Sequence, residues 1–271
     1  MSAAGSTRPA MGTGPTPATP APGAIDAHVY VGERLHGGGV DAAELVARID
    51  AAGVSRAFAV PAKPRGYHLG PANDLAAAAQ RDFPASLRCL ARVDPNQGDA
   101  AADELVRALD VLGLKGLFLH PHEELFRVNA PLVRPLLEIL RERGLPLMIA
   151  TGWLAVSEGP QVADLARQFP DVQIVMTNGG QINLSGLGQT DAEIALDEHP
   201  NVTVQTAGTY REDFIEGCVA RFGAERVLYA SSCPLMDPRL EVRRVQWAPN
   251  LDDAQKQLML GGNAGRILWR D

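Results

Sequence analysis

The sequence lacks the features that mark several large classes of protein. Its 271 residues include three cysteines, Cys89, Cys218 and Cys233, and no Cys-x-x-Cys pair, which excludes a disulfide framework and a structural zinc knuckle. No stretch approaches the roughly 20 apolar residues of a membrane span, and the N-terminus lacks a secretory signal pattern. We therefore expect a cytoplasmic protein in a reducing compartment, with no membrane partner.

Positive charge is also scarce. The 25 basic and 32 acidic residues give a net charge of -7 and a pI near 5.4. Nucleic acids and anionic membranes are bound through basic surfaces, so this balance predicts neither as a partner and favours a small-molecule substrate. The acidic pair Glu123 and Glu124 is interpreted as part of a solvated face. High usage of Ala, Gly and Arg indicates a GC-rich bacterial genome.

The chain divides into a tail and one domain. Residues 1–23 contain one charge, Arg8, and no aromatic or branched aliphatic side chain, so folding them would bury almost nothing, and we expect a disordered Ala/Pro/Thr-rich tail. Residues 24–271 alternate short apolar runs with longer stretches at helical spacing. The eight runs are 24–30, 54–60, 86–93, 114–120, 146–150, 172–177, 201–206 and 226–230.

Helical stretches separate these runs, which requires the strands to be parallel. They fall near 41–52, 72–83, 99–112, 131–143, 160–169, 188–198 and 211–222, with 239–247 and 252–260 after the last run. Eight parallel strands close into a barrel, so the predicted fold is a single (β/α)8 barrel of the α/β class. An open doubly wound sheet is the alternative, but the glycines at 37–39 lack the GxGxxG spacing of its phosphate loop.

Six segments carry a family resemblance. In order they are IDAHVYVGE at 25–33, GLKGLFLHP at 113–121, GLPLMIATG at 144–152, FPDVQIVMTNGG at 169–180, GAERVLYASSCP at 223–234 and GGNAGRIL at 261–268. Together they resemble the amidohydrolase-related family, which includes aminocarboxymuconate semialdehyde decarboxylase and the pyrone dicarboxylate lactonases. The resemblance implies a metal-dependent-hydrolase-like barrel, an active site at the carboxyl ends of the strands, and association into homodimers.

The family's metal ligands are mostly replaced. The family pattern is HxH after the first strand, a His after the fifth, a His after the sixth and an Asp after the eighth. This chain has His28 and Tyr30 at the HxH pair, and Ala150, Asn178 and Ser232 at the other positions. Catalytic zinc takes about three ligands from His, Cys and carboxylate. We therefore predict no metal and no cofactor.

A relocated metal site is the alternative. His120 and His122 have the one-residue spacing that places two side chains on the same side of an extended chain. No third ligand is fixed by the sequence. The competing interpretation is that both lie at the mouth of the barrel among the substrate-binding residues.

The surviving polar groups on the first strand are candidates for proton transfer. His28 has an ordinary pKa near 6.5 and is the predicted base or acid. Asp26 precedes it by two residues, and strict alternation places both on the inner face, where Asp26 either orients the imidazole or ties loops together below it. Tyr30 follows on the same face and is a donor to a carbonyl or enolate oxygen.

Three further catalytic candidates follow later strands. Asn178 and Ser232 are predicted neutral donors to an oxyanion, which suits anion stabilisation better than activation of water by a metal. Cys233 is a nucleophile if a nearby cation lowers its pKa, although free cysteines are usually buried apolar residues.

Basic and aromatic residues near the strand ends are predicted to bind substrate. Lys63, Arg65 and Arg92 favour an anionic small molecule, because Lys and Arg recognise carboxylates. Trp153 follows a predicted strand closely, so its ring is expected to form one wall of the pocket.

These features predict a metal-independent enzyme of amidohydrolase ancestry. It would act on a small carboxylated or carbonyl-bearing molecule, as a hydrolase or as a lyase or cyclase, by His-mediated proton transfer and oxyanion stabilisation. The alternatives are a non-catalytic ligand-binding protein that keeps the barrel, and an enzyme with a relocated metal site.

Overall fold

Short parallel strands, nine in the described part of the chain, form the centre of the molecule. The computed structural model describes residues 23–35, 37–66, 68–181, 186–209 and 211–269, so the predicted tail lies outside the described residues except for Gly23. The strands are β1 (Ile25–Val31), β2 (Arg56–Pro61), β3 (Leu87–Cys89), β4 (Ala91–Arg92), β5 (Leu117–Leu119), β6 (Leu147–Ile149), β7 (Ile174–Met176), β8 (Val202–Gln205) and β9 (Val227–Leu228). Every pairing between neighbours is parallel.

Backbone hydrogen bonds join these strands into a ring of eight positions. The pairing orders are β1-β2-β3 and β4 to β9 in sequence. Only Leu90 separates β3 from β4, and its N–H bonds to Ala59 O of β2 at 3.0 Å, so the two segments occupy one position. The ring closes because Ala27 N–H bonds to Tyr229 O at 3.0 Å and Tyr30 N–H bonds to Cys233 O at 2.7 Å. The predicted (β/α)8 barrel is confirmed.

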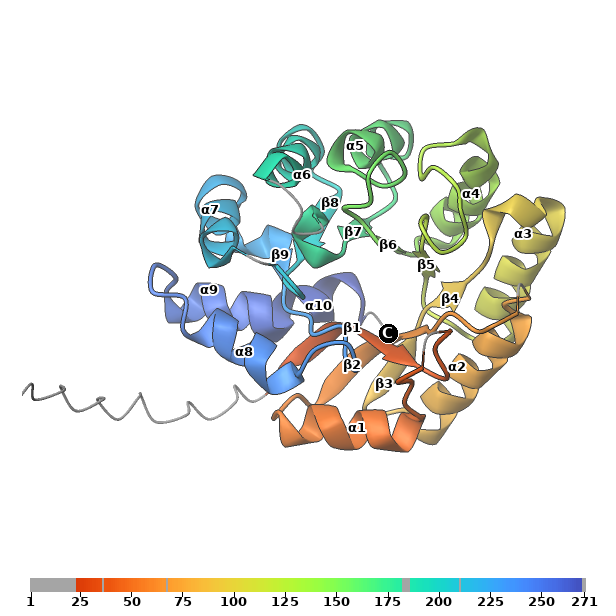
Figure 1. Cartoon of the computed structure of the whole chain (residues 1–271), viewed down its shortest axis with the longest axis horizontal. Helices are drawn as coiled ribbons and strands as arrows, with labels where there is room; N and C mark the ends of the chain where they lie inside the picture. The colour runs from red at the N-terminus through yellow and green to blue at the C-terminus, as the bar shows by residue number, and fades with distance from the viewer. Residues whose placement is uncertain (1–22, 36, 67, 182–185, 210, 270–271) are drawn as a thin grey trace, which may run out of the picture.

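Helices surround the strands, as Figure 1 shows. Their ends follow local chemistry: Asp41 accepts a hydrogen bond from Glu44 N–H at the start of the first helix, and Gly144, with φ of 60°, ends the fourth. No helix in the described ranges is long and apolar enough to cross a membrane. The helices are α1 (Ala42–Ala51), α2 (Gly70–Asp82), α3 (Asp99–Val106), α4 (Arg134–Arg143), α5 (Gly159–Gln168), α6 (Gly186–Glu198), α7 (Glu212–Phe222), α8 (Pro238–Gln246), α9 (Asp253–Gln257) and α10 (Asn263–Ile267).

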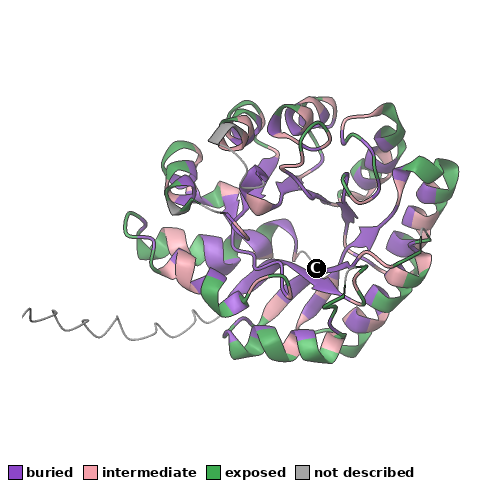
Figure 2. Ribbon diagram, in the orientation of Figure 1, coloured by how far each residue is buried: buried purple, intermediate pink, exposed green. Residues whose placement is uncertain are grey.

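Apolar side chains form two cores on either side of the strand ring. The outer core lies between strands and helices, and the inner core fills the barrel with residues such as Phe58 and Phe118. In Figure 2 the strands are almost entirely buried, with Arg56 and Arg88 partly exposed, and the helices are exposed on their outer faces. The last helix, α10, was not predicted; with the residues after it, it contributes Ile267 and Leu268 to the inner core, and the Trp269 ring meets Phe58 edge-on at 5.3 Å.

A bulge in β1 changes which way its polar residues point. Asp26 pairs with Ala57 and Val29 pairs with Ala59, so three steps along β1 match two along β2. The alternation that placed Asp26 and His28 on one face therefore fails. Asp26 shares its register with Ala57, an outer-core residue, whereas Ala27 and Tyr30 belong to the inner core.

Candidate functional site

A cavity of about 380 Å³ opens at the carboxyl ends of the strands. This volume suits a small molecule, and the location is where barrel enzymes hold their substrates. The sequence analysis selected five of the lining residues and missed four. The five are Tyr30, Lys63, His120, His122 and Trp153; the four are Arg34, Leu35, Glu123 and Leu235.

One wall of the cavity is aromatic. The rings of His122 and Trp153 are parallel, with centroids 3.8 Å apart and an interplanar angle of 2°. The His120 ring lies 6.1 Å from Trp153. Because the His122 ring is stacked on Trp153, it forms part of this aromatic wall.

His120 is a neutral hydrogen-bond donor. Its Nδ1 accepts a bond from Glu123 N–H at 3.3 Å, so Nε2 carries the hydrogen, and that atom lies 3.8 Å from Glu123 Oε2. Burial lowers the pKa of His120 to about 3, with Arg92 adding to the decrease and Glu123 opposing it. The imidazole therefore stays uncharged at neutral pH and presents an N–H beside a carboxylate.

A buried ion-pair cluster supports this side of the cavity. The Arg92 guanidinium is fully buried, where it donates to Glu123, to Glu124 Oε1 at 2.8 Å and to Pro61 O at 3.1 Å. Lys63 Nζ donates to the same Glu124 oxygen at 3.0 Å. The interpretation of Glu123 and Glu124 as a solvated face is therefore wrong, because Glu124 is 5% exposed and both carboxylates bind cations.

This cluster changes the roles of the predicted cations. Arg92 and Lys63 are already paired with carboxylates, and Arg92 does not line the cavity. Arg65 is exposed on the loop after β2 and is not part of the lining either. Burial raises the pKa of Glu124, while Arg92 and Lys63 oppose the increase.

Two of the predicted catalytic residues, His28 and Ser232, are buried and do not line the cavity. His28 is 1% exposed, and its Nδ1 lies 3.3 Å from Gln205 Nε2 and 3.2 Å from Ser232 Oγ. Gln205 Oε1 accepts from Ala207 N–H at 2.6 Å, so the amide NH₂ faces the ring and His28 Nδ1 is an acceptor. The hydrogen then lies on Nε2, a buried atom with no hydrogen-bond partner in the described part of the chain.

The His28 imidazole is also a weak base in this setting. Burial lowers its pKa to about 3, and His120 and Arg92 contribute. Gln205 was missed by the sequence analysis. The alternation of side chains along β8 is the sequence signal that could have identified it. Val202 and Val204 face the outer core, so Gln205 faces the opposite, inner side of the strand.

The remaining candidates are held by local contacts. Asn178 Oδ1 accepts from Thr177 Oγ1 at 2.7 Å, and its amide donates to Ala207 O at 3.3 Å. Cys233 is a buried outer-core residue, and burial raises the pKa of its thiol to about 11, the direction opposite to that of an activated nucleophile.

Asp26 holds the junction between the first and last strands. Its Oδ1 accepts from the N–H groups of His28 at 3.1 Å and Ser231 at 2.9 Å, and Oδ2 accepts from the Tyr229 hydroxyl at 3.3 Å. These contacts correspond to the predicted role of tying segments together, and the His28 contact is to the backbone. Burial raises the pKa of Asp26 to about 7, against the lowering effect of these hydrogen bonds.

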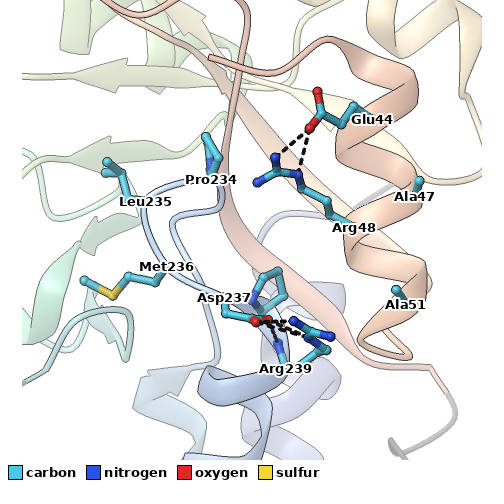
Figure 3. Close-up of a pocket in the computed structure, with 10 residues that line it drawn as sticks. Glu44, Ala47, Arg48, Ala51, Pro234, Leu235, Met236, Asp237 and Arg239 are labelled. Atoms are coloured by element: carbon cyan, nitrogen blue, oxygen red, sulfur yellow. Dashed lines mark hydrogen bonds and ion pairs between the residues drawn. The ribbon is translucent and has the colours of Figure 1, made fainter. Parts of the chain in front are cut away.

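A second cavity of about 500 Å³ lies outside the barrel, between α1 and the loop before α8. Figure 3 shows that its two arginines are engaged within the wall: Arg48 with Glu44, and Arg239 with Asp237. Leu235 lines both cavities. The catalytic machinery of a barrel belongs at the strand ends, so the smaller cavity is the candidate site.

Comparison with known proteins establishes the family. The amidohydrolase family model matches residues 30–269, and the chain belongs to this family. No curated protein sequence matches the chain.

Solved structures share the fold at low sequence identity. The 5-carboxyvanillate decarboxylase of Sphingomonas paucimobilis is 20% identical, with a TM-score of 0.74 over 92% of this chain and 100% of that one. The Novosphingobium aromaticivorans enzyme of the same name, complexed with manganese, is 18% identical, with a TM-score of 0.72 over 90% and 95%. The 4-oxalomesaconate hydratase of Rhodopseudomonas palustris is 19% identical, with a TM-score of 0.66 over 90% and 95%.

The residues of this chain do not fit a metal ion of the kind bound by the manganese complex. No group of three His, Cys, Asp or Glu side chains in the described ranges is arranged to hold one. At the family position, the lone pair of His28 Nδ1 faces the Gln205 amide and Nε2 carries a hydrogen, so neither nitrogen is free to coordinate. Tyr30, Ala150 and Ser232 provide neither imidazole nor carboxylate.

Proposed function

We propose that this chain is a metal-independent enzyme that acts on a small carboxylated or carbonyl-bearing molecule by lyase chemistry. The observation that supports the proposal most is the pair formed by the His120 imidazole and the Glu123 carboxylate, 3.8 Å apart in the lining of the strand-end cavity. His120 supplies a neutral N–H, which can stabilise the oxygen of an enolate. Glu123 supplies a carboxylate, which can carry the proton that is lost when the enolate forms.

His120 would stabilise the oxyanion. A neutral imidazole that donates one N–H to a developing negative charge acts without changing its own protonation state. His120 and Glu123 both line the cavity, and His120 Nε2 lies 3.8 Å from Glu123 Oε2. In loss of water Glu123 is the proton carrier: burial raises its pKa, but His120 and Arg92 outweigh that effect and keep the carboxylate ionised, so it takes the proton next to the carbonyl and passes it to the departing hydroxide. In loss of CO₂ the proton that replaces the carboxyl group comes from water.

His28 has a different part in this proposal from the one that the sequence suggested. It is absent from the cavity lining, and its low pKa makes it a poor proton acceptor. Its ring lies 4.7 Å from that of Tyr30, which does line the cavity. His28, Gln205 and Ser232 thus act as positioning residues that support Tyr30 from below.

Lyase chemistry fits these groups better than hydrolysis. Hydrolysis without a metal needs a base strong enough to activate water, whereas both imidazoles have depressed pKa values and Glu123 is bound to Arg92. Loss of CO₂ or water next to a carbonyl needs mainly stabilisation of the anion that remains. The decarboxylase and hydratase among the structural neighbours carry out reactions of these two kinds.

The test combines metal analysis with turnover. Purified protein would be treated with a chelator and assayed with 5-carboxyvanillate, 4-oxalomesaconate and simpler oxo and hydroxybenzoic acids. We expect activity that survives chelation, and a fall in kcat of about 100-fold in His120→Gln, the typical cost of one oxyanion donor. Glu123→Gln should abolish proton transfer, and Glu142→Gln, which changes an exposed glutamate on α4, is the matched control.

Two outcomes would overturn the proposal. One is a stoichiometric metal whose removal abolishes activity and whose return restores it, which would establish a relocated metal site. The other is full activity in both His120→Gln and Glu123→Gln.

A non-catalytic binding protein is the second candidate. The shielding of His28 and Ser232 below the cavity favours it, since these residues replace or retain family ligand positions and neither lines the cavity. Tight binding of carboxylates without turnover across the panel would support this candidate over the enzyme.

A further inference from the structure

We propose that Arg34, with the hydroxyl of Tyr30, binds the carboxylate of an anionic ligand in the strand-end cavity. This inference deepens the proposed function, on which it rests for the identity of the site, by naming the group that recognises the substrate's charge. Arg34 was not among the basic residues that the sequence analysis selected.

Charged side chains lie in the lining of the cavity and directly behind it. Three cations, Arg34, Lys63 and Arg92, face two carboxylates, Glu123 and Glu124. Lys63 and Arg92 both bind Glu124 Oε1, at 3.0 and 2.8 Å, and Arg92 also binds Glu123. The two carboxylates therefore neutralise Lys63 and Arg92, and the remaining positive charge is that of Arg34.

Arg34 is available for a ligand. Arg34 lines the cavity, and its guanidinium forms no hydrogen bond or ion pair with any residue that the structure describes. The side chain is neither fully exposed nor buried, so its charge acts in a partly desolvated setting where attraction to an anion is stronger than in water. A planar guanidinium matches the two oxygens of a carboxylate.

Tyr30 provides a second donor in the same volume. Its hydroxyl has no partner in the described ranges, and its ring is fixed by the rings of His28 at 4.7 Å and Phe118 at 6.0 Å. Burial raises its pKa, so the hydroxyl keeps its proton, and the charge of Arg34 is close enough to influence it. A phenol and a guanidinium together satisfy a carboxylate better than either does alone.

The position of this pair also sets the orientation of the ligand. Arg34 follows β1, whereas Trp153 follows β6, on the opposite side of the ring of strands (Figure 1). A ligand whose carboxylate meets Arg34 therefore extends its apolar body toward Trp153 and passes His120 and Glu123. The ligand class is a small, flat carboxylate with a carbonyl or hydroxyl group beyond the carboxylate that Arg34 binds.

Calorimetric binding with a charged probe and a neutral probe tests the inference. Benzoate and benzamide have nearly the same shape, and only benzoate carries a negative charge. In Arg34→Gln we expect the affinity for benzoate to fall about tenfold to a hundredfold, the usual range for one charge-assisted hydrogen-bonded pair, while the affinity for benzamide stays the same. Arg34→Lys should be intermediate, and Tyr30→Phe should lose a few-fold for benzoate.

The matched control is Arg127→Gln, which removes an exposed arginine that does not line the cavity. It should bind both probes as the unmodified protein does. Unchanged benzoate affinity in Arg34→Gln, an equal loss for benzamide, or no benzoate binding by the unmodified protein would overturn the inference. Because binding is measured without turnover, a protein that binds benzoate through Arg34 but has no activity would refute the proposed function alone.

Discussion

Replacing Asp26 by Asn should make the protein more stable at neutral and alkaline pH and leave the candidate site working. Oδ1 of the new amide can accept from the N–H groups of His28 and Ser231, as the carboxylate does. Its Nδ2 can donate to the Tyr229 oxygen, because the Tyr229 hydroxyl also has Pro238 O as an acceptor at 3.3 Å. The two N–H groups and the Tyr229 hydroxyl therefore stay paired, and no buried charge remains.

The size of the effect follows from the pKa of the buried carboxyl. Burial raises that pKa from an ordinary 3.8 to about 7. The folded protein therefore holds a proton that the unfolded chain releases between about pH 4 and pH 7, and the free energy of unfolding falls as pH rises through this range. At about 1.4 kcal/mol per pKa unit, the loss approaches about 4 kcal/mol above pH 7.

Urea unfolding at pH 5 and pH 8 measures this difference. The unmodified protein should lose stability between the two values, and Asp26→Asn should lose less, with an advantage at pH 8 of up to about 4 kcal/mol. Turnover or carboxylate binding should be unchanged. A variant that is destabilised at pH 8, or that loses activity while folded, would refute the reasoning and restore Asp26 as a catalytic carboxylate.

Three other predictions concern packing and charge. Arg92→Met should lower the free energy of unfolding by about 3–5 kcal/mol in chemical denaturation, because it leaves Glu124 buried with Lys63 as its remaining ion-pair partner; a change below about 1 kcal/mol would contradict this assignment. Gly159→Ala should lower the free energy of unfolding by at least about 1–3 kcal/mol, because the added Cβ would lie 1.7 Å from Asp191 O. The control Gly217→Ala, in open space on α7, should raise the free energy of unfolding by about 0.5–1 kcal/mol. Benzoate affinity should not change between pH 5 and 8 through titration of His28 or His120, because both pKa values are lowered to about 3. A change in affinity near pH 6.5 that His120→Gln removes would contradict this and show that the imidazole is exposed to solvent.

The fold was predictable because local signals agree with it along the whole chain. Each predicted apolar run overlaps an observed strand, and 86–93 contains both β3 and β4. The observed helix ends have the local chemistry that favours an end, as at the capping Asp41 and the left-handed Gly144. Helix α10 was missed because only five residues form it, too few to show a helical period.

The candidate site was predictable in part, and the failures have physical causes. Residues at strand ends, such as Lys63 and Trp153, point where a barrel requires and were selected correctly as lining. Asp26 was placed on the wrong face because a bulge shifts the alternation, and no residue type near it signals a bulge. The pairing of Glu124 with Arg92 joins the loop after β5 to the end of β4, 32 residues earlier, and a sequence pattern does not encode that contact.

The base of the barrel is completed by residues from both ends of the fold. Ile25 of the first strand shares the inner core with Ala264, Ile267 and Leu268, and Gly261 packs so closely on Gly23 that an added Cβ would lie 2.6 Å from its carbonyl oxygen. During synthesis, the inner core at the base of the barrel therefore stays incomplete until residues 263–269 have left the ribosome. A nascent chain of this protein must keep its first strand from aggregating throughout translation, and a chaperone that shields emerging apolar strands is expected to raise its yield.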